Sequence, residues 1–256
     1  MNRLQGKTAL ITGATSGIGK AIAEQLADLG CNLILTGRRS QRLKEFSKQL
    51  TETSEILVSV SAFDVRDLEA CKSFSKKYKD FAIDILVNNA GLAKGIDSIQ
   101  SASFEDWDEM IDTNVKGLLF MTRLLLPQLL ERNSGHIINI GSIAGHETYP
   151  GGSVYCATKH AVKAITKATK IDVHGTNIRV SMVSPGLVET EFSNVRFYGD
   201  DNRADSVYDG FEPLTAYDIA EIVVFIANRP SHVNILDSII MPVAQSSAQM
   251  VHRYEK

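Results

Sequence analysis

Cysteine is scarce in this sequence of 256 residues. The three cysteines, Cys31, Cys71 and Cys156, form no C-x-x-C pair and no cysteine–histidine spacing. An odd number without such spacing argues against a disulfide framework or a structural zinc site and is compatible with a reducing compartment. We therefore expect a cytoplasmic protein that holds no metal. Cys156 adjoins Tyr155, but an isolated cysteine is most often a small packing residue, and we expect that role here.

The sequence also has little excess charge and no long hydrophobic run. It carries 27 basic and 30 acidic side chains, for a formal net charge of −3, and the basic residues are scattered. This gives no electrostatic basis for binding nucleic acid or an anionic membrane. The apolar run near the N-terminus is too short for a signal peptide. The run at 117–130 is interrupted by Arg123 and Pro127 and is too short to span a bilayer. We expect a soluble protein.

Short aliphatic runs alternate with longer amphipathic segments along the whole chain. Strands that are apolar throughout indicate a parallel sheet covered on both faces. Strict alternation of strand and helix then predicts one doubly wound, Rossmann-type α/β domain over residues 1–256, with about seven strands. The expected strands lie at 7–12, 31–36, 55–63, 83–88, 136–140, 177–184 and 238–243, and the expected helices at 17–29, 39–50, 66–80, 105–131, 153–174 and 216–228.

One segment breaks this alternation. Residues 186–214 are polar and contain several glycines, with Pro185 and Pro213 near the ends. A long insertion after a strand of such a sheet is more often a functional loop than packing. We predict a substrate lid at about 187–213.

A glycine-rich turn follows the first expected strand. Gly13, Gly17 and Gly19 lie in "TGATSGIG", where missing Cβ atoms allow a ligand to approach the backbone closely. The next helix would direct its free N–H groups and the positive end of its dipole at a phosphate. The spacing is G-x-x-x-G-x-G and not the general G-x-G-x-x-G. Its position between the first strand and the first helix still predicts dinucleotide binding.

The end of the second strand predicts which dinucleotide binds. An acidic residue there would bind the ribose hydroxyls of NAD. This chain instead has Gly37 followed by Arg38 and Arg39. A guanidinium suits a 2′-phosphate, which a carboxylate would repel. The sequence therefore favours NADP over NAD. The alternative interpretation is that Arg38 and Arg39 are solvated side chains at the start of a helix and contact no phosphate.

Tyr155 and Lys159 lie four residues apart and share one face of an expected helix. A nearby ammonium lowers the pKa of a phenol, which could then move a proton to or from an alcohol oxygen. The pair alone is a weak signal. Ser142 lies just beyond the fifth strand, where ligands bind in such sheets. Asn114 interrupts an apolar helix, either for a function or for a structural hydrogen bond.

Together these motifs resemble the short-chain dehydrogenase/reductase family over essentially the whole chain. The resemblance implies that Tyr155 is the general acid–base and that Ser142 holds the substrate oxygen. It also implies that Lys159 binds the nicotinamide ribose and lowers the tyrosine pKa, and that Asn114 supports a proton relay. The matching motifs are TGATSGIG (12–19), DV (64–65), NNAG (88–91), Asn114, Ser142, Tyr155 with Lys159, and PG (185–186).

The resemblance also implies a set of cofactor contacts. The glycines would face the pyrophosphate, Asp64 and Val65 the adenine, Asn89 the adenosine-side ribose, and Val188 and Thr190 the nicotinamide carboxamide. The basic residue that NADP-preferring members often carry in the glycine turn is absent. The expected cofactor residues are Gly13, Thr15, Ser16, Gly17, Ile18, Gly19, Arg38, Arg39, Asp64, Val65, Asn89, Ala90, Gly91, Tyr155, Lys159, Pro185, Gly186, Val188 and Thr190.

The C-terminal third is similar to the NADP-dependent 3-hydroxy acid dehydrogenases that accept serine or allo-threonine. Arg196, within the expected lid, could pair with a substrate carboxylate or could be a solvated surface residue. Two alternatives stay open, namely a reductase of another carbonyl, such as a 3-oxoacyl thioester, sugar or steroid ketone, and an NADP-binding sensor without catalysis. Long helices at 105–131 and 153–174 and a tail beyond the last strand suggest a homo-oligomer, a dimer or a tetramer.

Overall fold

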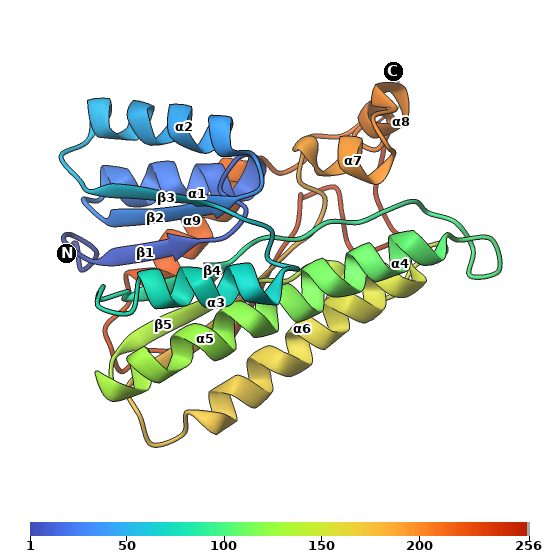
Figure 1. Cartoon of the computed structure of the whole chain (residues 1–256). Helices are drawn as coiled ribbons and strands as arrows, with labels where there is room; N and C mark the ends of the chain where they lie inside the picture. Colours follow the sequence, from blue (N-terminus) through green and yellow to red (C-terminus); the bar gives the residue numbers. More distant parts are fainter. Residues whose placement is uncertain (255–256) are drawn as a thin grey trace.

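The fold is one parallel β-sheet with helices on both faces (Figure 1). The computed structural model describes residues 1–254. Within them, seven strands pair in the order β3-β2-β1-β4-β5-β6-β7. The strands are β1 (Thr8–Ile11), β2 (Asn32–Gly37), β3 (Val58–Ala62), β4 (Ile85–Asn88), β5 (Gly135–Ile140), β6 (Ile178–Pro185) and β7 (Asp237–Ile240). The predicted fold class is confirmed.

Two helical layers enclose the sheet (Figure 1). One layer contains α1, α2 and α9, and the other contains α3, α5 and α6. The helices are α1 (Gly17–Asp28), α2 (Ser40–Thr53), α3 (Leu68–Lys77), α4 (Phe104–Ile111), the π-helix η1 (Asp112–Gly117), α5 (Leu118–Glu131), the short 3₁₀ turn η2 (Ile143–Gly145), α6 (Ser153–Asp172), α7 (Glu191–Arg196), α8 (Asp201–Ser206) and α9 (Ala216–Ala227).

The strands are apolar throughout because their alternate side chains fill two separate cores. Ile11 and Leu35 are partners in the register of β1 and β2, and both pack beneath α1, α2 and α9. The neighbouring partners Leu10 and Ile34 point to the opposite face, where α3 and α5 cover them. Burial on both faces explains why these strands show no polar alternation.

The strand order reverses beside β1, which lies between β2 and β4. In a doubly wound sheet the two connections that leave such a point run to opposite faces and open a crevice at the carboxyl ends of the strands. The glycine turn after β1 and the loop after β4 both lie at this edge. The fold therefore brings together the segments that carry most of the predicted site residues.

Two predicted segments differ in the structure. Residues 105–131 do not form one regular helix, because the π-helix η1 separates α4 from α5. Asn114 lies in η1 and bonds the backbone of Leu92, and π-turns of this kind are frequent at functional sites. The polar segment after β6 is also not a plain loop, since it folds into α7 and α8, with Thr190 capping α7.

Candidate active site

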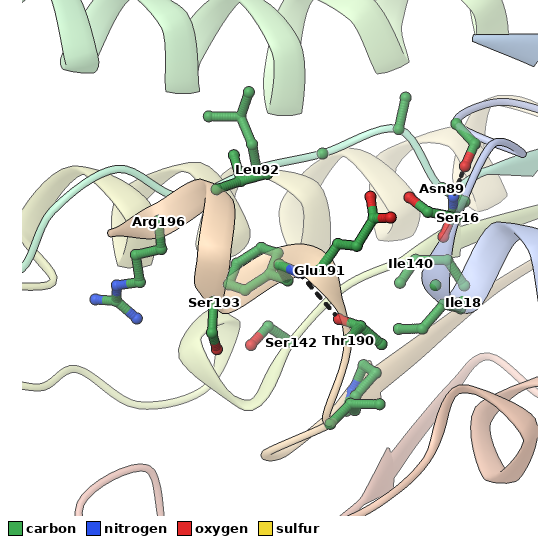
Figure 2. A pocket seen from close by; sticks show the side chains of 18 of the residues that line it. Ser16, Ile18, Asn89, Leu92, Ile140, Ser142, Thr190, Glu191, Ser193 and Arg196 are labelled. Carbon is green, nitrogen blue, oxygen red and sulfur yellow. Dashed lines mark hydrogen bonds between the residues drawn. The ribbon is translucent and has the colours of Figure 1, made fainter. Parts of the chain in front are cut away.

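A cavity of about 440 Å³ opens at the carboxyl ends of the strands. The ends of β1, β2, β4, β5 and β6 contribute to its wall, and α7 covers it (Figure 2). All predicted site residues line this cavity except Gly19 and Asn114, which lie behind the wall. The sequence did not single out the wall residues Phe63, Leu92, Thr113, Ile140, Tyr149, Leu187, Glu191, Phe192, Ser193, Val195, Val207, Tyr208, Gln245 and Ala248.

The glycine turn presents backbone to the cavity. Gly13 and Gly17 have φ values of +68° and +53°, which favour glycine over any residue with a Cβ atom. Ser16 precedes α1, and its side chain makes no capping hydrogen bond to the first turn of that helix. The N-terminal N–H groups of α1 are therefore available to an anion.

Gly19 has a different role from the one predicted. A Cβ atom at Gly19 would lie 2.4 Å from the Nδ2 of Asn89 and 2.5 Å from the carbonyl oxygen of Gly13. Asn89 Nδ2 donates to the carbonyl oxygens of Thr12 (2.8 Å) and Gly13 (3.2 Å). The Oγ1 of Thr12 in turn accepts from the N–H groups of Asn89 and Ala90, both at 3.0 Å. Gly19 thus makes room for the asparagine that fixes the turn, and it does not face the ligand space.

The two predicted arginines make different contacts. Arg39 donates to the hydroxyls of Thr15 and Ser16 at 2.8 and 2.7 Å, so it lies directly beside the glycine turn. Arg38 extends toward the carboxylates of Glu109 (3.6 Å) and Asp64 (4.0 Å). Both arginines line the cavity.

Asp64 is held mainly by its neighbour. Arg66 donates to both oxygens of the carboxylate, through its backbone N–H at 3.0 Å and its guanidinium at 2.7 Å. Partial burial raises the pKa of Asp64, but the hydrogen bonds from Arg66 outweigh burial and the pKa is lowered. The carboxylate is therefore ionised and firmly oriented at the wall of the cavity.

Tyr155, Ser142 and Lys159 line the same cavity as the arginines. Tyr155 and Lys159 project from α6 and are both buried. Ser142 follows β5 and caps η2, accepting from the N–H of Ala144 at 3.1 Å. The Nζ of Lys159 donates to the carbonyl oxygen of Ile140 at 3.0 Å. The turn after β5 and the first half of α6 thus bring a hydroxyl, a phenol and an amine into one pocket.

The ionisation of this pair differs from the sequence-based expectation. Burial raises the pKa of Tyr155, and the neighbouring Tyr149 adds to the rise, while a hydrogen bond with Ser142 opposes it. The Nζ of Lys159 lies 5.9 Å from the centre of the Tyr155 ring. Burial also lowers the pKa of Lys159 to about 8. Desolvation therefore dominates the shift, and Tyr155 is a neutral phenol here.

Asn114 connects three segments behind the site. Its Oδ1 accepts from the N–H of Leu92 at 2.9 Å, and its Nδ2 donates to the carbonyl of Leu92 at 2.8 Å and to the hydroxyl of Thr158 at 3.0 Å. The amide of Asn114 is thus fully used in joining η1 to the loop after β4 and to α6. The structural hydrogen bond that the sequence left open is present.

The helix α7 brings Phe192 and Arg196 to the cavity. The ring centres of Phe192 and Tyr155 are 5.7 Å apart. The Nε of Arg196 donates to the carbonyl of Gly95 at 3.0 Å, and its guanidinium carbon lies 5.4 Å from the ring centre of Tyr149. One buried guanidinium nitrogen of Arg196 has no hydrogen-bond partner in residues 1–254. Arg196 is thus not a solvated surface arginine.

Cys156 and His146 stay outside the reactive group. Burial raises the pKa of the Cys156 thiol, as expected for a packing residue. His146 does not line the cavity, since its ring bonds the Ser184 hydroxyl at 3.1 Å and the Lys163 amine at 2.8 Å.

Comparison with known proteins shows which family has this fold. The short chain dehydrogenase family matches residues 7–199. The chain belongs to this family. The prediction made from its motifs is thereby confirmed.

Among short-chain dehydrogenases, several similar proteins have described activities. The NADP-dependent 3-hydroxy acid dehydrogenase of Schizosaccharomyces pombe is 46% identical over 258 residues, covering 99% of each chain. The enzyme of the same description from Salmonella typhi is 48% identical over 250 residues, covering 95% of this chain and 98% of its own. The closed form of serine dehydrogenase complexed with NADP⁺ is 46% identical, with a TM-score of 0.91, and covers 96% of this chain and 99% of its own.

Through residue 254, no helix combines the length and the apolar character needed to cross a bilayer. In the same range, no three histidine, cysteine or acidic side chains are grouped so as to hold a metal ion.

Proposed function

We propose that this chain catalyses the NADP-dependent oxidation of a small 3-hydroxy acid such as serine or allo-threonine. The observation that carries the proposal is one cavity lined by Tyr155, Ser142 and a half-buried Arg196 with an unpaired buried nitrogen, and also by Arg38 and Arg39. The relatives described above support both the cofactor and the substrate class. Their identity and coverage favour this activity over reduction of a bulkier ketone.

The residues around the cavity fit NADP. The open N-terminus of α1 and the glycine turn suit a pyrophosphate, and Arg39, with Arg38 nearby, suits a 2′-phosphate. Lys159 would bind a ribose hydroxyl, and Val188 and Thr190 would meet the carboxamide. When bound, NADP supplies the hydride acceptor. Every other part of the reaction falls to the side chains of this protein.

Tyr155 would move the proton. In oxidation, Tyr155 must first lose its own proton, and the resulting phenolate takes the proton of the substrate hydroxyl while a hydride leaves the carbon that carries this hydroxyl. Ser142 holds the substrate oxygen and stabilises its developing negative charge. Burial keeps Tyr155 neutral in the protein alone, so oxidation needs positive charge near the phenol. The guanidinium of Arg196, 5.9 Å from the ring centre, lowers the tyrosine pKa, and the Nζ of Lys159 lies at the same distance. In the reverse direction, the neutral phenol donates directly.

Arg196 would hold the substrate carboxylate. Its Nε is used by Gly95, which fixes the plane of the guanidinium and leaves a buried nitrogen available. Arginine binds carboxylates through parallel N–H donors, so the free nitrogen suits an acid better than a neutral alcohol. The segment at about 187–213, which carries Arg196, would act as the lid of this single domain.

We further propose a cytoplasmic homotetramer. Exposed apolar side chains on the helices α4 and α5 and on α6 support self-association, namely Phe104, Leu119, Leu130 and Ile171. The absence of disulfide spacing supports a reducing compartment. Sedimentation of the purified protein tests the assembly.

The decisive experiment compares the wild type with Tyr155→Phe. Initial rates are measured with NADP and NAD on serine, allo-threonine, 3-hydroxyisobutyrate and simple aldehydes. In the variant, NADP affinity should stay within about twofold, while kcat falls by about 10²–10⁴ because the proton acceptor is lost. Retained turnover would exclude Tyr155 as the acid–base. Tight NADP binding by the wild type without turnover of any substrate would instead indicate a sensor.

A further inference from the structure

Glu191, the first residue of α7, forms ion pairs with two arginines. One is Arg39, which directly precedes α2, and the other is Arg42, in the first turn of α2. Its two carboxylate oxygens accept from Arg39 and Arg42, each at 2.8 Å. Partial burial raises the pKa of Glu191, but the two arginines outweigh burial and lower the pKa, so the carboxylate stays charged at neutral pH. Each oxygen thus has its own guanidinium partner.

These ion pairs join two parts of the molecule that are far apart in sequence. Arg39 and Arg42 lie at the start of α2, beside the glycine turn, whereas Glu191 lies in the segment that covers the cavity. In Figure 2, Glu191 extends from α7 toward the side where Ser16 and Asn89 lie, and Arg196 extends to the opposite side. At its other end, α7 is held by two hydrogen bonds between Arg196 and Gly95.

The two arginines differ in their access to the cavity. Arg39 lines it and contacts the hydroxyls of the glycine turn, but Arg42 does not line it. The pair of Glu191 with Arg42 therefore lies outside the predicted phosphate contacts. Glu191 itself lines the cavity, but Arg42 can hold it from outside while Arg39 engages a cofactor phosphate.

We propose that Glu191 is a positioning residue that anchors the start of α7 to α2 and so holds Phe192 and Arg196 over Tyr155. The inference rests on the proposed function for its substrate readout, but the anchoring contact itself does not depend on turnover. Without the pair, α7 is held mainly at its Arg196 end. Its substrate-facing side chains then spend less time in place, and the substrate binds more weakly at saturating NADP.

The test uses Glu191→Gln, Arg42→Gln, the double variant and the control Glu189→Gln. Glu189 is exposed, lies two residues away and does not line the cavity. Its replacement removes the same charge and should leave KM for serine unchanged.

The three ion pair partners are about half exposed, at 40% for Arg39, 50% for Arg42 and 47% for Glu191. Exposed pairs are weak, so we expect KM for serine at saturating NADP to rise about two- to fivefold in each single variant.

A second readout needs neither substrate nor cofactor. Arg196 and Arg203 are tryptic sites within 187–213, and the initial rate of their cleavage reports how often this segment opens. Cleavage should rise about two- to fivefold in Glu191→Gln and Arg42→Gln but not in Glu189→Gln. The double variant should behave like Glu191→Gln alone, because the same contact is removed twice.

Several outcomes would overturn the proposal. Unchanged cleavage in both single variants would do so, as would additive effects in the double variant. A loss of NADP affinity in Glu191→Gln with unchanged KM for serine would place Glu191 in the cofactor site. Failure of the proposed function is distinguishable, because the wild type would then oxidise none of the hydroxy acids while the cleavage rates still tested the anchor.

Discussion

At the scale of single residues, burial decides the ionisation of the reactive pair. Spacing along α6 places Tyr155 and Lys159 on one face, and a charge argument from the sequence predicts a lowered tyrosine pKa. In the folded protein, removal of water raises the pKa of Tyr155 and lowers that of Lys159 to about 8. Desolvation disfavours both charged forms, and it dominates because both side chains are enclosed.

The buried lysine has a consequence for stability. The pKa of Lys159 falls from 10.5 to about 8 on folding, so between these values the unfolded chain binds more protons and the free energy of unfolding rises with pH. Below pH 8 the full cost of the buried charge is present. Lys159→Met should therefore stabilise the cofactor-free protein by about 1–3 kcal/mol at pH 7, and the two proteins should converge above pH 10.5.

Denaturant unfolding at pH 7 and pH 10.5 measures this difference. Lys167→Met is the control, since Lys167 is exposed on the same helix and should change stability by less than about 0.5 kcal/mol. A Lys159→Met variant that is less stable than the wild type at pH 7 would show that the hydrogen bond to Ile140 is worth more than the desolvation cost.

At the scale of elements, the π-helix η1 adapts one long helix to the site. The amphipathic pattern over 105–131 predicts one regular helix, but the buried residues of the π-helix are Thr113, Asn114 and Gly117. The wider turns at Asp112–Gly117 place Asn114 against Leu92 and Thr158. Side-chain spacing alone does not reveal such a turn, although a buried asparagine in an apolar helix indicated a special contact.

Replacement of Asn114 separates a structural role from a relay role. Asn114→Ala leaves the buried N–H and carbonyl of Leu92 without their partners and should cost about 2–4 kcal/mol in the free energy of unfolding. Thr158→Val removes only one of the asparagine's partners and should cost about 1 kcal/mol. Unfolding by urea measures both. Full stability of Asn114→Ala with lost turnover would instead assign Asn114 to proton transfer alone.

At the scale of the whole molecule, the C-terminal tail folds back over the site of its own chain. Gln245 lines the cavity and accepts from the N–H of Leu187 at 2.8 Å. Arg253 donates to the carbonyls of Val207 and Asp209, and the N–H of Tyr254 donates to Gly210 at 2.6 Å. The tail beyond β7, which the sequence suggested for self-association, therefore supports the segment that covers the cavity.

Removal of residues 247–256 tests that support. The sheet and its two helical layers do not include the tail, so the truncated protein should keep wild-type far-UV circular dichroism. The covering segment loses its Arg253 and Tyr254 contacts, and KM for serine should rise roughly tenfold, which corresponds to about 1.4 kcal/mol. Arg253→Ala should give an intermediate rise. An unchanged KM in the truncated protein would show that α7 and α8 need no tail.

The sequence predicted most of the fold and much of the site. Local pattern was enough for the strands, because two-sided burial requires continuous apolar runs at 7–12 and 31–36. It was also enough for the glycine turn, Ser142 and the Tyr155–Lys159 pair, since each lies next to the end of a strand or on one helix face. The sequence analysis did not predict the contacts of three residues. Glu191 and Arg42 pair with each other across 149 positions, and Thr12 bonds backbone N–H groups. Of these three residues, only Thr12 had a signal in the sequence, since it is the first residue of the motif TGATSGIG.

By itself, the sequence determined the alternation of strands and helices, the candidate reactive side chains and the arginines after β2. These properties are local, since they depend on side-chain period, on residues adjacent to strand ends and on residue chemistry. Only the tertiary structure decided which side chains lose water, where Asn114 and Gly19 act, and how Glu191 and the tail hold α7. These depend on contacts between segments up to 152 residues apart, and no spacing along the chain specifies which distant segments meet.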